Sequence, residues 1–91
     1  MAVYCVSYDL KGPNPDYEPL IEALQSEGKW WHFLESTWLV STDETSSELY
    51  KRLLPALTRK DCILIIEVPN NAQGWLPREA WDWIRNNVPE P

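Results

Sequence analysis

Hydrophobic and polar positions follow two different periods along this chain, and the switches between them predict the secondary structure. Four short segments are rich in β-branched and aromatic residues and read as strands, namely residues 2–8, 29–34, 37–42 and 61–68. Three other segments carry apolar residues three or four positions apart, as amphipathic helices do, namely the segment between Asp16 and Gly28 and residues 46–57 and 77–87.

Local signals set the ends of the predicted helices. Asp16 has the side chain of an N-cap, and Pro19 falls in the first turn, where a missing N–H costs little. Gly28 is expected to stop the first helix. Pro55 lies late in the second helix and should kink or shorten its last turn.

The resulting order, βαββαβα, is the split βαβ arrangement of ferredoxin-like α+β folds, with a spatial strand order of 4-1-3-2. We expect a single domain over residues 1–91. Its βαββαβ core covers about residues 1–68, and a loop, an additional C-terminal helix and a tail cover residues 69–91.

The fourth strand bears on oligomeric state. Right-handed crossovers place the first two helices on the same sheet face, yet residues 61–68 are almost continuously apolar, which predicts a strand buried on both faces. Either the C-terminal helix or a second subunit would cover the other face. We expect both to act together, which predicts a homodimer or a higher oligomer.

Aromatic residues are concentrated in the predicted hairpin. The chain has six Trp residues, and residues 29–40 contain three of them together with the only Phe and the only His. Strand parity places Trp30 and His32 on one face and Trp31 and Phe33 on the other. One set should fill the core, and the other should meet the C-terminal helix or a ligand.

A base could stack on an exposed indole beside His32, with hydroxyl and amide groups nearby to read its edge. The candidate ligand-binding residues are Trp30, His32, Ser36, Thr37, Trp38, Asn70 and Asn71. The alternative is that most of these aromatic side chains are core.

Charge and composition exclude several classes of protein. Eight basic residues face fourteen acidic ones, for a net charge of −6. An extended nucleic-acid duplex is therefore not an expected partner, because such binding depends on Lys and Arg. No stretch approaches the roughly 18 apolar residues of a membrane span. With no signal peptide expected and Cys5 and Cys62 both in apolar runs, we predict buried free thiols and a cytoplasmic protein.

Part of the chain resembles known families. Ser7-Tyr8-Asp9 at the end of the first strand, Gly28 after the helix, the hairpin, and Asp61 before an apolar strand are similar to the small CRISPR adaptation endoribonucleases and to virulence-associated protein D. This likeness covers about residues 1–68 and lies mostly at the level of the fold.

A second resemblance covers nearly the whole chain. It is carried by four short motifs, Trp30-Trp31-His32, Ser36-Thr37-Trp38, Ile66-Glu67-Val68 and Gly74-Trp75-Leu76-Pro77. These motifs resemble a family of short bacterial and phage proteins known as SinR-like. The chain has no helix-turn-helix pattern, so that name does not imply a DNA-binding repressor here.

Asp9 is the leading candidate for catalysis. The resemblance to the adaptation nucleases implies that an Asp at this strand end binds a divalent metal such as Mg²⁺, with each of two subunits offering one carboxylate. The alternative is that Asp9 opens the turn that follows it. His32 has no second His and no Cys-x-x-Cys partner for zinc, and as a general base it would need Glu35 or Asp9.

These observations favour a non-catalytic homo-oligomer that binds a nucleotide-like or other small anionic ligand through an aromatic pocket, with no cofactor and no catalytic residue. A role in bacterial–phage defence or counter-defence is one hypothesis for its use. The alternatives are a metal-dependent endonuclease centred on Asp9 with Mg²⁺, and a protein-interaction module.

Overall fold

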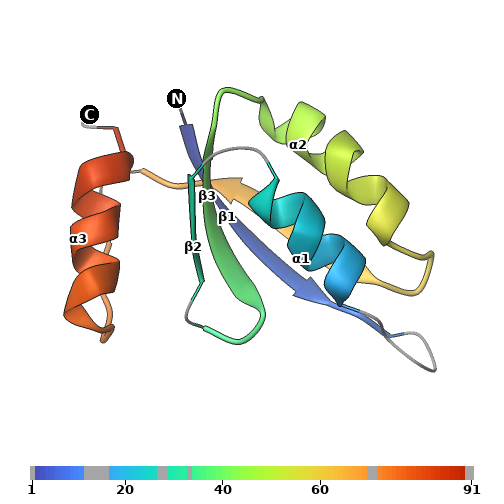
Figure 1. The fold of residues 1–91 in the computed structure, drawn as a ribbon, viewed down its shortest axis with the longest axis horizontal. Helices are drawn as coiled ribbons and strands as arrows, with labels where there is room; N and C mark the ends of the chain where they lie inside the picture. The colour runs from blue at the N-terminus through green and yellow to red at the C-terminus, as the bar shows by residue number, and fades with distance from the viewer. Residues whose placement is uncertain (1, 12–16, 27–28, 33, 70–71, 90–91) are drawn as a thin grey trace.

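A computed structural model describes residues 2–11, 17–26, 29–32, 34–69 and 72–89 of the chain. Its elements, drawn in Figure 1, follow in the order β1 (Ala2–Asp9), α1 (Glu18–Gln25), β2 (Lys29–His32), β3 (Thr37–Thr42), α2 (Ser46–Leu53), the short 3₁₀ helix η1 (Leu54–Ala56), β4 (Cys62–Glu67) and α3 (Arg78–Asn87). The predicted α+β class is confirmed.

The four strands form one antiparallel sheet in the order β2-β3-β1-β4. Read from the β4 edge, this is the order 4-1-3-2. Val6 in the middle of β1 stands opposite Trp38 on β3 and Ile65 on β4. Residues that stand opposite each other project from the same face, so this register fixes which side chains meet the helices.

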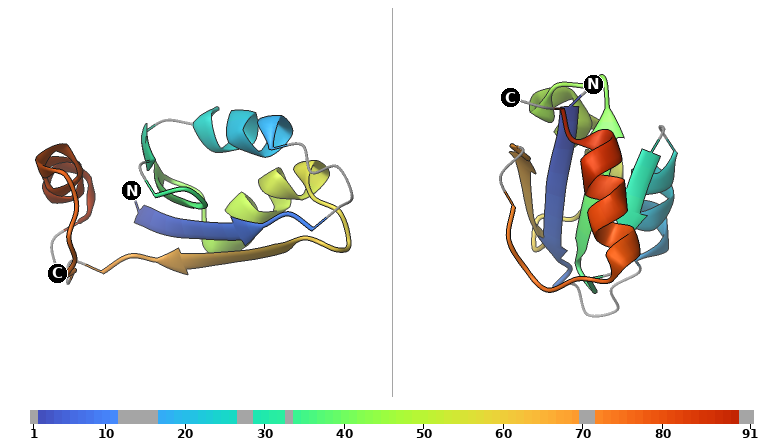
Figure 2. Two further views of the ribbon diagram at one scale, coloured as in Figure 1. Left: turned by 90° about the horizontal axis from the view of Figure 1, so that it is seen from below. Right: turned by 90° about the vertical axis from the view of Figure 1, so that its left-hand side faces the viewer.

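Both α1 and α2 lie on one face of the sheet (Figure 2, left). The side chains that fill this layer share the even-numbered positions of β1 and β3 or the inner faces of the two helices, and they are Tyr4, Val6, Tyr8, Trp38, Val40, Leu20, Leu24, Leu49 and Leu53. Leu20 and Leu24 are four residues apart, as are Leu49 and Leu53, which places each pair on one helix face. The helix period read from the sequence therefore identifies the core.

The opposite face of the sheet is covered at one end. α3 stands beside that end, near the start of β1 (Figures 1 and 2), where Val3 and Ser41 are buried. On β4, by contrast, Leu64 and Ile66 are 57% and 53% exposed. The prediction that this strand is buried on both faces is wrong for the single chain, because α3 does not extend over β4.

The helix ends follow local chemistry. Thr45 and Glu48 form a capping box at the start of α2, with each side chain accepting the other residue's backbone N–H. Pro55 ends regular α-helix at Leu53 and leaves one 3₁₀ turn, so the predicted shortening is confirmed. Pro19 lies in the first turn of α1, whereas the predicted signals Asp16 and Gly28 lie outside the described residues.

One charged contact joins α2 to α1. The Arg52 guanidinium bonds to the Glu44 carboxylate, with Nε 3.0 Å from Oε2, and also to the carbonyl of Ala23 and to Ser26 Oγ at 2.9 Å. Thr42 Oγ1 donates a further hydrogen bond to the same carboxylate, at 3.0 Å. These contacts fix the loop before α2 against the C-terminal end of α1.

Both cysteines are free thiols, with Cys5 half-buried and Cys62 exposed. The prediction that both are buried is wrong for Cys62, because it projects from the uncovered face at the start of β4. Among the described helices, none combines the length and the apolar character that crossing a membrane requires.

Candidate functional site

A small pocket opens where the end of β1, the start of α1 and the β2–β3 turn meet. Its volume is about 200 Å³, and its lining residues are Tyr8, Tyr17, Ile21, His32, Glu35 and Ser36. The turn is held against β1 by a hydrogen bond from Tyr8 N–H to the Ser36 carbonyl, at 3.2 Å. Two of the predicted site residues, His32 and Ser36, are therefore brought together by strand pairing.

The His32 ring is fixed by two contacts. Its imidazole stacks on the Trp38 indole, with ring centroids 4.0 Å apart and an interplanar angle of 8°. Its Nε2 lies 3.1 Å from the Glu35 carbonyl oxygen. Because a carbonyl oxygen can only accept, Nε2 is the donor in this contact. The exposed imidazole is thus a rigid, oriented plane.

Trp38 supports the pocket from behind. Its side chain is 1% exposed, and its Nε1–H donates to the Tyr8 hydroxyl at 3.1 Å. The Trp30 ring lies 5.1 Å from the Trp38 ring and is exposed at the β2 edge. The prediction that Trp38 contacts a ligand directly does not match this placement, because its side chain is buried in the core.

Thr37 points away from the pocket. It stands opposite Ser7 in the register, on the face without α1 and α2, and the two hydroxyl oxygens are 3.3 Å apart. The one-residue step from Ser36 reverses the side-chain direction, as it does in any strand. The candidates Asn70 and Asn71 lie outside the described residues.

Four lining residues were not among the ligand-binding candidates from the sequence: Tyr8, Tyr17, Ile21 and Glu35. Glu35 was considered only as a possible partner of His32. The Tyr8 and Tyr17 rings lie 6.1 Å apart and tilted by 47°, so they form an aromatic wall facing the His32 side. Tyr8 was detectable as a core-facing position, since it shares parity with Val6. Its closeness to the turn depends on the register between β1 and β3, which the hydrophobic pattern alone specifies only to within shifts of two residues.

The charge of the pocket constrains its ligands. Among the described residues that line it, Glu35 is acidic, and none is Lys or Arg. Aromatic faces and hydroxyl groups suit a flat ring that carries hydrogen-bonding groups at its edge. The lining has no Lys or Arg side chain to pair with a phosphate group.

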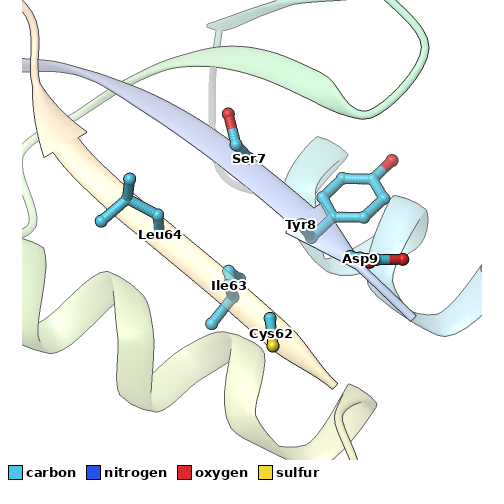
Figure 3. Close-up of a pocket in the computed structure, with 6 residues that line it drawn as sticks. All are labelled: Ser7, Tyr8, Asp9, Cys62, Ile63 and Leu64. Carbon is cyan, nitrogen blue, oxygen red and sulfur yellow. The ribbon is translucent and has the colours of Figure 1, made fainter. Parts of the chain in front are cut away.

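Asp9 lies in a different place, at the open end of β1. It borders a shallow hollow of about 310 Å³, drawn in Figure 3, that is lined by Ser7, Tyr8, Asp9, Cys62, Ile63 and Leu64. The Asp9 carboxylate is exposed and pairs with Lys11 Nζ at 3.6 Å. Within the part of the chain that the structure describes, no three His, Cys, Asp or Glu side chains converge on one point.

Asp61, next to this hollow, has a structural role. Its carboxylate accepts the backbone N–H of Thr58 at 2.8 Å and that of Lys11 at 3.0 Å. These two hydrogen bonds lower the pKa of Asp61, the Thr58 bond more than the Lys11 bond. The residue therefore ties the loop before β4 to the end of β1.

Comparisons of the chain with protein-family models, with curated proteins and with solved structures found no match.

Proposed function

We propose that this protein is a binding module that takes a flat heteroaromatic ring, such as the base of a nucleotide-like ligand, into the pocket beside His32. The observation that carries this proposal is the His32 imidazole, stacked on a buried indole and fixed by its bond to the Glu35 carbonyl. A ring held in this way provides a stacking surface without losing side-chain freedom when a ligand binds.

The size of the pocket favours one ring system. A cavity of about 150 Å³ holds a benzene molecule, so about 200 Å³ suits a single base and not a whole nucleotide. Any sugar or phosphate would then extend outside the pocket. The preference for an anionic ligand that the sequence suggested thus has less support than the preference for a base, because the described lining has no Lys or Arg side chain.

Tyr17 is the residue through which to test the proposal, since it lines the pocket and is 39% exposed. The probes are adenosine, cytidine, guanosine and uridine, titrated against tryptophan fluorescence. Base stacking on an aromatic residue is worth about 1–3 kcal/mol, so Tyr17→Ala should weaken binding of the preferred nucleoside by roughly tenfold or more.

Tyr50 provides the matched control. It is 43% exposed on α2 and does not line this pocket, so Tyr50→Ala should leave nucleoside affinity unchanged. Saturable binding that falls in Tyr17→Ala alone would support the proposal. Absence of saturable binding by all four nucleosides, or equal loss in both variants, would overturn it.

We also propose a ferredoxin-like fold for the βαββαβ core, a cytoplasmic location, and self-association. The ferredoxin-like assignment is supported by the strand order and by the two helices on one face. Self-association is supported by the exposed Leu64 and Ile66 side chains on β4.

A metal-dependent nuclease centred on Asp9 is the alternative. In the described structure the charged partner of Asp9 is Lys11, and no specific observation favours metal binding there over the ion pair. A role in bacterial–phage defence is a hypothesis about the biological use of the protein. The pocket bears only on the type of ligand that the protein binds.

A further inference from the structure

β4 is an edge strand with few of the features that usually protect such an edge. Its six residues, Cys62–Glu67, include one charged residue, Glu67 at the strand end, and no Lys, Pro or Gly. Leu64 and Ile66 are more than half exposed. Natural proteins usually shield a free edge with charges, Pro, bulges or very short strands. The opposite edge, β2, has four residues and begins at Lys29.

The backbone direction of β4 follows from its pairing with β1. Val68 N–H donates to the Val3 carbonyl at 2.8 Å, so the even-numbered residues of this segment point their backbone groups toward β1. In an antiparallel ladder the alternate residues point away. Ile63, Ile65 and Glu67 therefore direct three N–H and three C=O groups to the outer edge, where no strand of the described chain pairs with them.

We propose that a second copy of this chain pairs with β4 in antiparallel orientation, about a two-fold axis that passes beside Ile65. In this register Ile65 meets Ile65 of the second copy, and Ile63 meets its Glu67. All three outward-pointing residues of each copy then lie in hydrogen-bonded pairs, which gives six hydrogen bonds across the interface. The result is one continuous eight-stranded sheet.

The symmetry restricts the possible registers. A two-fold axis between antiparallel edge strands is normal to the sheet, so the uncovered faces of both copies lie on the same side. Because the outward-pointing backbone groups must face each other, the allowed registers differ by steps of two residues. One neighbouring register would set Glu67 opposite Asp61 of the second copy. That pairing is disfavoured because both side chains are acidic and the Asp61 N–H already bonds to the Thr58 carbonyl at 3.1 Å. The other neighbouring register would set Ile63 opposite Pro69 of the second copy, which has no N–H to donate.

The proposed register also pairs the exposed apolar side chains. Leu64 stands opposite Ile66 of the second copy on the uncovered face, in a non-hydrogen-bonded pair whose side chains approach closely. The two Glu67 carboxylates are four positions apart, about 13 Å along the strands, which exceeds the Debye length of about 8 Å at physiological salt. In-register parallel pairing would instead place them side by side.

This dimer does not assemble the two-subunit metal site considered for Asp9. Asp9 stands opposite Cys62, so the two Asp9 residues would be six positions apart along the strands and three strands apart across the sheet. That separation is about 25 Å at ordinary strand spacings. The edge-paired dimer and a shared Asp9 site are therefore mutually exclusive.

A disulfide cross-link tests the register directly. The register puts Cys62 opposite position 68 of the second copy, at a Cα separation near 4.5 Å that a disulfide can span. Val68→Cys should therefore yield a disulfide-linked dimer under mild oxidation, seen on a non-reducing gel. Val68→Cys combined with Cys62→Ser should not, and neither should Glu67→Cys, whose side chain projects from the other face.

Sedimentation velocity tests the interface without added cysteines. Leu64→Lys should raise the dimer dissociation constant by roughly two- to thirtyfold, because each dimer then loses two apolar cross-strand pairs. Leu34→Lys is the matched control, since Leu34 is 45% exposed and lies in the β2–β3 turn, away from β4. Circular dichroism establishes that both variants are folded.

A monomeric parent protein at 100 µM, or a folded Leu64→Lys variant that dimerises as well as the parent, would overturn the proposal. So would cross-linking of the parent through Cys62 to Cys62, since the register holds these residues six positions apart. Nucleoside binding by the pocket is measured separately. Failure of the dimer proposal would therefore leave the binding proposal intact, and failure of the binding proposal would leave the dimer proposal intact.

Discussion

The exposed imidazole of His32 lies parallel to the buried indole of Trp38, at a centroid distance of 4.0 Å and an angle of 8°. The indole in turn donates a hydrogen bond to the Tyr8 hydroxyl, and the Tyr8 side chain lines the same pocket. The pocket is therefore built directly on the hydrophobic core, and substitutions that disturb Trp38 should affect stability before they affect binding.

Truncation of the two hairpin tryptophans separates core from surface. Trp38→Ala should lower the free energy of unfolding by about 3–5 kcal/mol, the usual cost of deleting a buried large aromatic side chain. Trp30→Ala should cost much less, because its ring is exposed at the β2 edge. Urea unfolding followed by far-UV circular dichroism measures both. Equal costs would contradict the assignment of Trp38 as the buried support.

The Glu44–Arg52 contact predicts a pH dependence. Hydrogen bonding by Arg52, helped by Thr42, lowers the pKa of Glu44 from its ordinary value of 4.5, and partial burial opposes the shift. A lowered pKa in the folded state means that the stabilisation is present above the ordinary value and is lost as the pH falls through the folded value.

Glu44→Gln should therefore cost about 1–3 kcal/mol at pH 7, as expected for hydrogen bonds to a charged group, and progressively less below pH 4.5. The measurement is urea unfolding of the parent and the variant from pH 7 to pH 3. The pKa of Asp61 is also lowered. Its protonation in acid destabilises the parent and the variant equally, so this effect cancels from the difference between their unfolding free energies. A difference that stays constant with pH would contradict the role of the Glu44 charge.

The capping box of α2 predicts a third stability effect. Thr45→Ala removes the acceptor for the Glu48 N–H and should cost about 1 kcal/mol. Ser47→Ala, in the first turn of the same helix, serves as the control and should change stability by less than half of that amount. Thermal unfolding would distinguish them. A Thr45→Ala variant as stable as Ser47→Ala would show that the cap contributes nothing.

Much of the fold could be predicted from local patterns. The strand and helix segments, the shortened turn at Pro55 and the core pairs Leu20–Leu24 and Leu49–Leu53 all follow from periodicity and propensity. The periodicity of apolar residues could not predict how much of the sheet face opposite α1 and α2 stays uncovered. An apolar run such as β4 looks the same whether its second face meets a helix or stays exposed, as Leu64 does.

The candidate site was predicted only in part. His32 and Ser36 line the pocket together because the β2–β3 turn places them there, but the contributions of Tyr8, Tyr17 and Ile21 come from segments far apart in sequence. Trp38 and Thr37 were candidates for contact with a ligand, yet one is core and the other faces Ser7. Strand parity separates the two faces but does not say which of them a helix covers.

The most direct test of the proposed binding function is a ¹H–¹⁵N NMR titration of the protein with adenosine and, separately, with cytidine. The account predicts saturable shifts that are largest at Tyr17, Ile21, His32, Glu35 and Ser36, with little change along β4. It also predicts that Tyr17→Ala reduces these shifts while Tyr50→Ala does not. Shifts that never saturate, or that map to Cys62–Glu67 instead of the pocket, would contradict it.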